Sequence, residues 1–259
     1  MTKYLSILFV LLCFSCNQSG SQKQEAENKN EVLLMGMIHD GHRKYEEYDV
    51  DVVRTLIKAI KPDLILAEIP PDRFDQAMKD FQELDTIVEP RVGRFPEYVD
   101  VIFPLTKEMD FKIIPTAGWT KEMADARSVK LKEISQDSSR KEDWGRFMAA
   151  RKKADSLMEA TGRKYDPYFI NSDQYDEYSV VRYSVYNELF NDELGPGGWD
   201  NINVSHYSYI EKALNEYTNQ GKRILITYGA AHKAWFLTKL RKRDDIEIIY
   251  LKDIVPKEN

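Results

Sequence analysis

Two apolar stretches, far apart in the chain, each end in the same short motif. Val32-Leu33-Leu34 leads into Gly36-Met37-Ile38-His39, and Ile224-Leu225-Ile226-Thr227 leads into Gly229-Ala230-Ala231-His232. Continuous apolar runs rich in β-branched residues are typical of strands that are covered on both faces of a parallel sheet. Because ligands bind outside the carboxyl ends of such strands, the two histidines are expected to meet in one pocket.

Strand-like and helix-like patterns alternate along the chain. Apolar residues at helical spacing between 48 and 60 separate the first apolar run from another at 63–69, which predicts a strand–helix–strand unit. Further strands are expected at 111–115, 223–228 and 246–251, and further helices at 74–84, 96–110, 121–134, 139–160, 203–219 and 230–241. Residues 165–190 form a tyrosine-rich stretch. The predicted fold is α/β, with a central, mostly parallel sheet flanked by helices and a helical subdomain inserted at about residues 119–198.

The N-terminus has the pattern of a bacterial lipoprotein signal. Lys3 supplies a positive charge, residues 5–14 an apolar core, and Ser15-Cys16 a small residue before a cysteine. We expect a signal peptide at residues 1–15, with cleavage before Cys16 and acylation of that residue. The acylated cysteine makes a lipid bilayer the expected partner. An ordinary signal peptide or membrane anchor is the alternative.

A polar stretch follows the cysteine. Residues 16–30 contain few apolar side chains, which predicts a flexible tether and leaves residues 31–259 as the folded domain. Asn17 lacks the acidic character of an inner-membrane retention signal. We therefore expect a lipid-anchored protein of the cell envelope, at the outer membrane and on either of its sides.

Charge and cysteine content exclude several classes of function. The formal net charge is −6, and basic residues are interleaved with acidic ones, so nucleic-acid binding is not expected. The two cysteines, Cys13 and Cys16, fall in the signal and at the acylation site. The mature fold is therefore expected to have no disulfide framework, no cysteine metal ligand and no cysteine nucleophile.

Glu68 is the third candidate for the site. It ends the second apolar run, where an ionised side chain is costly to bury without a partner, so it is expected at the same edge as His39. Glu68 could ligate a metal or act as a general base, or it could form an ion pair with Arg73. Asp40 and His42 add polarity after His39, and His42 is either a second ligand or an exposed loop residue.

These anchors resemble a known group. The two Gly-x-x-His motifs, Pro62-Asp63 before Glu68, and Arg73 after it resemble the TraB/PrgY, GumN and Tiki superfamily, which is related to erythromycin-esterase-like and ChaN-like haem-binding proteins. The resemblance implies a metal-dependent hydrolytic site formed by His39, Glu68 and His232. It also implies that Arg73 matches the arginine that follows the glutamate.

The chain departs from this group at one position. Relatives often carry Arg-Asn before the helix that precedes the last Gly-x-x-His strand, whereas Ile202-Asn203 stands here, so the arginine is missing. Asn203, with Arg73, His42 and Asp40, is a candidate for binding a peptide or small-molecule ligand.

The favoured hypothesis is a membrane-tethered metal-dependent hydrolase, most simply a peptidase. Two histidines and a carboxylate do not distinguish Zn, Mn and Co. The alternatives are a non-catalytic lipoprotein that binds haem or another small ligand, and a structural or regulatory lipoprotein with a vestigial site. Tyr175, Tyr178, Tyr183 and Tyr186 bear on the haem alternative, because haem can be ligated by tyrosine or histidine. Packing of one amphipathic helix is the other reading of these tyrosines.

Overall fold

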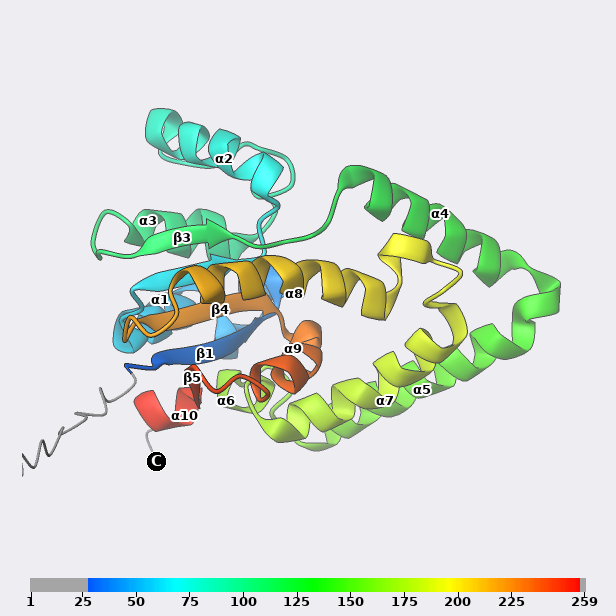
Figure 1. Cartoon of the computed structure of the whole chain (residues 1–259). Coiled ribbons are helices and arrows are strands. Elements are labelled where there is room, and N and C mark those ends of the chain that lie inside the picture. The colour runs from blue at the N-terminus through cyan, green and yellow to red at the C-terminus, as the bar shows by residue number, and fades with distance from the viewer. Residues whose placement is uncertain (1–27, 257–259) are drawn as a thin grey trace, which may run out of the picture.

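A five-stranded parallel sheet forms the centre of the computed structural model, which describes residues 28–256 (Figure 1). The strands are β1 (Asn30–Met37), β2 (Leu64–Ala67), β3 (Lys112–Pro115), β4 (Arg223–Gly229) and β5 (Ile246–Ile249). Their order is β3-β2-β4-β1-β5, and every neighbouring pair is parallel. The predicted α/β class is confirmed.

Strand β4 lies in the middle of the sheet, where both of its faces are covered. Residues 224–229 are all buried. The strand pairs with β1 on one side, where Val32 is opposite Ile224, and with β2 on the other, where Leu64 is opposite Ile224 as well. Strands β1 and β2 follow each other in the sequence, yet they are joined only through β4.

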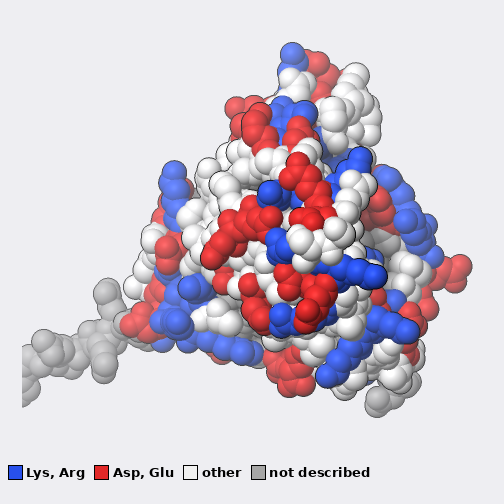
Figure 2. Space-filling view, turned by 90° about the vertical axis from the view of Figure 1, so that its right-hand side faces the viewer, with Lys and Arg blue, Asp and Glu red and all other residues white. Residues whose placement is uncertain are grey.

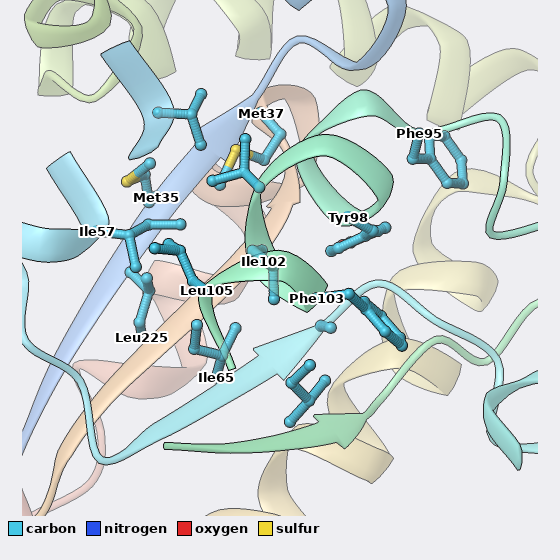
Figure 3. Packing of buried hydrophobic residues seen from close by; sticks show 14 of the residues in the cluster. Met35, Met37, Ile57, Ile65, Phe95, Tyr98, Ile102, Phe103, Leu105 and Leu225 are labelled. Carbon is cyan, nitrogen blue, oxygen red and sulfur yellow. The ribbon is translucent and has the colours of Figure 1, made fainter. Parts of the chain in front are cut away.

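Helices cover both faces of the sheet. They are α1 (Val50–Ile60), α2 (Pro71–Leu84), the π-helical turn η3 (Glu97–Ile102), α3 (Phe103–Leu105), α4 (Lys121–Gln136), α5 (Lys141–Ala160), α6 (Pro167–Ile170), α7 (Asp173–Phe190), α8 (Trp199–Glu216), α9 (Lys233–Leu240) and α10 (Leu251–Ile254). One apolar cluster packs α1, α2, η3 and α3 against the sheet, and part of it is shown in Figure 3. A second cluster packs α8 and α9 against the opposite face.

Residues between β3 and α8 form helices α4 to α7, of which α4, α5 and α7 extend past the carboxyl ends of the strands (Figure 1). Helix α6 lies beside the sheet, where its Ile170 joins the first apolar cluster. Helices α4, α5 and α7 enclose a small apolar cluster of their own, which includes Ile134, Phe147 and Phe190. On the face seen in Figure 2, Lys and Arg side chains intermingle with Asp and Glu. None of the helices in residues 28–256 is both long and apolar enough to cross a bilayer.

Two helix predictions were wrong in detail. The segment predicted as one helix at 96–110 begins with the π-helical turn η3, because Pro104 has no N–H to donate to the carbonyl of Asp100. The Arg54 guanidinium bonds that carbonyl instead. Helix α8 begins at Trp199 rather than at 203, since the side-chain carbonyl of Asn191 accepts the N–H of Asp200 at 2.9 Å and caps the earlier turn.

The N-terminal predictions lie almost entirely outside the described residues. These are the signal peptide, the acylation of Cys16 and most of the tether. Asn30, predicted as the last tether residue, is instead the buried first residue of β1. Its side chain donates to the Tyr217 carbonyl at 2.7 Å and accepts from the Lys222 N–H at 2.8 Å. The folded domain therefore begins before residue 31.

Candidate functional site

The ends of β1, β2 and β4 lie side by side, with β4 between the other two. Met37 is opposite Gly229 in the β1–β4 pair, and Ala67 is opposite Thr227 in the β2–β4 pair. The residues that follow these three strands therefore meet at the carboxyl edge, where parallel sheets bind ligands. The two Gly-x-x-His motifs lie at this edge, as predicted.

Close approach explains the glycine of each motif. The N–H of Gly229 donates to Glu68 Oε2 at 2.8 Å, and a Cβ on Gly229 would lie 2.8 Å from His39 Nε2. A Cβ on Gly36 would lie 2.9 Å from the Cα of Ala230, in the other motif. Gly229 therefore leaves room for a site side chain, whereas Gly36 lets the two motif backbones touch.

His39 follows β1 in a strained conformation. Its φ of 49° lies in the left-handed region, which costs roughly 1–2 kcal/mol for a residue with a Cβ. Its Nδ1 donates to Glu97 Oε1 at 2.6 Å, and its Nε2 lies 3.7 Å from Glu68 Oε2. Burial lowers the pKa of His39, but the carboxylates of Glu97 and Glu68 outweigh burial and raise this pKa to about 9. His39 is therefore an imidazolium at neutral pH.

Two buried carboxylates flank this imidazolium, and the sequence predicted only one of them. Glu68 follows β2, and its backbone N–H donates to the hydroxyl of Tyr98 at 2.7 Å. Glu97 comes from η3, is fully buried, and its Oε2 has no hydrogen-bond partner within residues 28–256. The signal that could have revealed Glu97 is an acidic residue on the buried side of an otherwise apolar segment.

His232 is held by three side chains. Its Nδ1 donates to Asn203 Oδ1 at 2.7 Å, and its ring stacks between Trp199 and Phe236, with ring centroids 4.8 and 5.9 Å away. Desolvation is the largest cause that lowers the pKa of His232 to about 4, although Glu68 opposes it. The ring is therefore neutral at pH 7, and its Nε2 carries a lone pair.

His206 was not predicted as part of the site. It lies on α8 in complete burial, its Nδ1 accepts the N–H of Gly118 at 2.8 Å, and its Nε2 has no hydrogen-bond partner among the described residues. A single histidine on an amphipathic helix gives little signal. The available clue was its spacing from Asn203, since residues three apart share a helix face.

Glu68, His206 and His232 together form a group that could hold a metal ion. One ligand atom from each residue lies within 4.8 Å of the others. The lone pair on His232 Nε2 fits such a role, and His206 Nε2 has no hydrogen-bond partner among the described residues that would compete with a metal. His39 is not a member of this group, so its predicted role as a metal ligand stays a prediction.

The two histidines of the group differ as ligands. The bond from Asn203 places the proton of His232 on Nδ1, which is the tautomer that a metal bound at Nε2 needs. The bond from Gly118 makes His206 Nδ1 an acceptor, so the neutral ring carries its proton on Nε2. A neutral His206 could bind a metal at Nε2 only if its proton moved to Nδ1 and the bond from Gly118 broke, and His232 is therefore the better prepared ligand.

Several predicted ligand-binding residues have other roles. His42 is neither exposed nor a ligand, because it is buried and its two ring nitrogens bond the Tyr48 carbonyl at 2.6 Å and the Ile38 N–H at 3.1 Å. Asn203 is fully buried, where it orients His232 and donates to the Trp199 carbonyl at 2.7 Å, and its predicted contact with a ligand stays a prediction.

Asp40 and Arg73 do not join the central group. Asp40 is exposed on the 3-10 turn η1 (His39–Arg43). Arg73 pairs with Asp72 at 3.1 Å rather than with Glu68, and its side chain lines a cavity beside the site. The ion-pair alternative for Glu68 is therefore wrong.

The tyrosines of α7 pack within the helical insertion. Tyr186 is buried against Phe147 and Phe190, and Tyr175 packs against Phe169. Tyr183 stacks on Trp199, with ring centroids 3.8 Å apart. These contacts favour the packing reading of the tyrosine-rich segment over a haem ligand, and haem binding stays an untested alternative.

Comparisons with known proteins add no assignment. No family model, no curated protein and no solved structure matches the chain. The resemblance to the TraB/PrgY, GumN and Tiki group therefore stays a prediction that rests on its motifs.

Proposed function

We propose that this protein is a metal-dependent hydrolase that cleaves peptide bonds and is tethered to a membrane through Cys16. The observation that carries the catalytic part is the convergence of Glu68, His206 and His232, whose ligand atoms lie within 4.8 Å of one another at the carboxyl edge of the sheet. The tether rests on the sequence pattern alone.

The donor set suits a catalytic metal. Two imidazoles and one carboxylate are the ligands of many hydrolytic zinc sites, which leave a position for water, and manganese or cobalt would also accept them. When bound, such an ion lowers the pKa of a coordinated water to about 7 and polarises a substrate carbonyl.

The surrounding residues would position the ligands and supply a proton. The N–H of Gly229 holds Glu68 Oε2 at 2.8 Å, and Asn203 fixes the tautomer of His232. His39 is the candidate general acid, because it is protonated at neutral pH, its side chain is 30 % exposed, and Glu97 orients its ring. It would donate its Nε2 proton to the leaving nitrogen of a peptide substrate.

Metal analysis tests the site. We expect the purified protein to retain about one equivalent of Zn, Mn or Co, and we expect His232→Ala and Glu68→Gln to lose it. Glu211→Gln, on the exposed face of α8, serves as the matched control. If both site variants retain the wild-type metal content, the metal hypothesis is wrong.

Hydrolysis needs a separate test. We expect the metal-loaded protein to cleave members of a mixed peptide library, as detected by mass spectrometry, and we expect chelation to abolish cleavage. His39→Gln should retain metal but lose most of the cleavage, since it removes the general acid. A metal-loaded protein that leaves the whole library intact would contradict the proposed peptidase activity.

A further inference from the structure

A cavity of about 410 Å³ lies beside the site. It is bounded by the start of α2, the loop before η3 and the start of α4. Trp119, in its wall, lies with its ring centroid 6.0 Å from that of His206, and Arg91 in the same wall interacts electrostatically with Glu68. The cavity and the site therefore share a boundary.

The acidic side chains of this cavity already have partners. Asp72 pairs with Arg73 at 3.1 Å, and Asp125 accepts from Lys121. Glu89 is buried, and its Oε2 accepts the backbone N–H groups of Arg91 and Val92 at 2.9 and 2.8 Å. These carboxylates leave little negative charge free for another cation.

Arg91 and Arg94 are different, because neither guanidinium has an ion-pair partner within residues 28–256. The two guanidinium carbons lie 5.2 and 5.5 Å from the ring centroid of Phe95, and this ring packs on His39, with centroids 4.5 Å apart. Arg91 is also partly buried. Glu68 and Glu89 act on Arg91 electrostatically but form no ion pair with it, so its partly buried charge is incompletely compensated and a ligand anion could pair with it directly.

The loop that carries these arginines is held independently of their guanidiniums. Asp80 is buried, and its Oδ2 accepts the N–H groups of Val88 and Glu89 at 3.0 and 2.6 Å. Together with the bonds to Glu89, this fixes the backbone before a ligand arrives. Such preorganisation reduces the entropic cost of binding.

We propose that Arg91 and Arg94 bind an anionic group, a carboxylate or a phosphate, of a ligand that reaches from this cavity to Glu68 and His232. Planar guanidiniums pair with such groups through two parallel hydrogen bonds. Naming this ligand as the substrate rests on the proposed function, but binding of the anion does not. For a peptidase, the ligand would carry an acidic side chain or a free carboxylate next to the cleaved bond.

Anion titration of the purified full-length chain tests the proposal. Sodium phosphate and sodium acetate are titrated separately at constant ionic strength, by calorimetry and by the shift of the thermal midpoint. We expect Arg91→Gln and Arg94→Gln each to weaken binding about tenfold, and Arg91→Lys to weaken it less. The matched control is Arg182→Gln, whose guanidinium lies 5.3 Å from the Tyr183 ring but does not line this cavity.

The outcomes separate this inference from the metal site. Tighter binding of phosphate would identify a phosphorylated ligand, and tighter binding of acetate a carboxylate ligand. Retention of anion binding in Glu68→Gln would support the inference even if that variant and the wild type both lack metal. Equal affinities in wild type, Arg91→Gln and Arg94→Gln, or an equal loss in Arg182→Gln, would overturn it.

Discussion

Replacing each motif glycine by alanine should separate the two roles of glycine in Gly-x-x-His. Gly36 lets the backbones of the two motifs touch, and Gly229 leaves room for the His39 side chain. In both Gly36→Ala and Gly229→Ala the new Cβ would lie 2.8 Å from its nearest neighbour, which is closer than real Cβ atoms approach. The neighbours differ, however. At position 36 they are Cβ and Cα of Ala230, and at position 229 the nearest atom is the far end of the His39 ring.

The nature of the neighbouring atom determines how much unfolding free energy each variant loses. In Gly36→Ala the backbones of the two motifs must separate by about 0.5 Å or more to reach ordinary contact. Overpacking of this kind costs typically ~1–3 kcal/mol, and we expect the upper half of that range because backbone cannot rotate away. In Gly229→Ala the ring of His39 can turn, so we expect a loss of about 1 kcal/mol. Moving that ring from Glu68 should also lower the pKa of His39.

Urea unfolding measures the loss of unfolding free energy in each variant, and NMR titration of the His39 ring measures its pKa. Gly145→Ala is the control, since Gly145 lies inside α5 with nothing within 4 Å of its Cβ position, and we expect it to gain about 0.5–1 kcal/mol. The reasoning is refuted if Gly36→Ala unfolds with the same free energy as Gly145→Ala. It is equally refuted if His39 titrates identically in wild type and Gly229→Ala.

Three further predictions address the metal site, the pH response and the anchor. Asn203→Ala should weaken metal binding by about 10–100-fold in a metal titration, because His232 loses its orienting acceptor. Glu97→Gln should lower the pKa of His39 from about 9. The stability that protonated His39 contributes is present below pH 6.5 and is lost as the pH rises to about 9. In urea unfolding, the variant should therefore lose this stability at a lower pH than the wild type. Cys16→Ser should release the protein from the membrane fraction, and failure of labelled fatty acid to enter the wild type would contradict acylation.

Much of the fold could be predicted, because buried parallel strands can be recognised in a sequence as continuous apolar runs. The runs before His39, Glu68 and His232 form β1, β2 and β4, three consecutive strands of the sheet with β4 between the other two. The order of these three strands could not be derived, since each of their runs is apolar on both faces and would fit a central position. Helix ends also depended on distant groups, such as the Asn191 side chain that caps α8.

The site was predictable only where its residues follow strands. His39, Glu68 and His232 come from strand ends, and parallel topology alone brings such ends together. His206 and Glu97 come from helical segments instead, where polar residues are common and periodicity does not show which ones face a pocket. His42 misled because a buried histidine that bonds backbone groups looks the same in sequence as a ligand.

The position of β4 also determines when this protein can fold. Residues 38–222 must be made and kept from mispairing before the strand that joins β1 to β2 becomes available. Pairing between strands so far apart in the sequence is slow, because the chain loses loop-closure entropy before the stabilising contacts form. A nascent or truncated chain that stops before residue 223 has the β2–β3 pair with an open edge and a β1 strand with neither of its neighbours, and it also lacks the N–H that holds Glu68. Protease resistance and metal binding by the group of Glu68, His206 and His232 should therefore arise together, and only in chains that have been synthesised past His232.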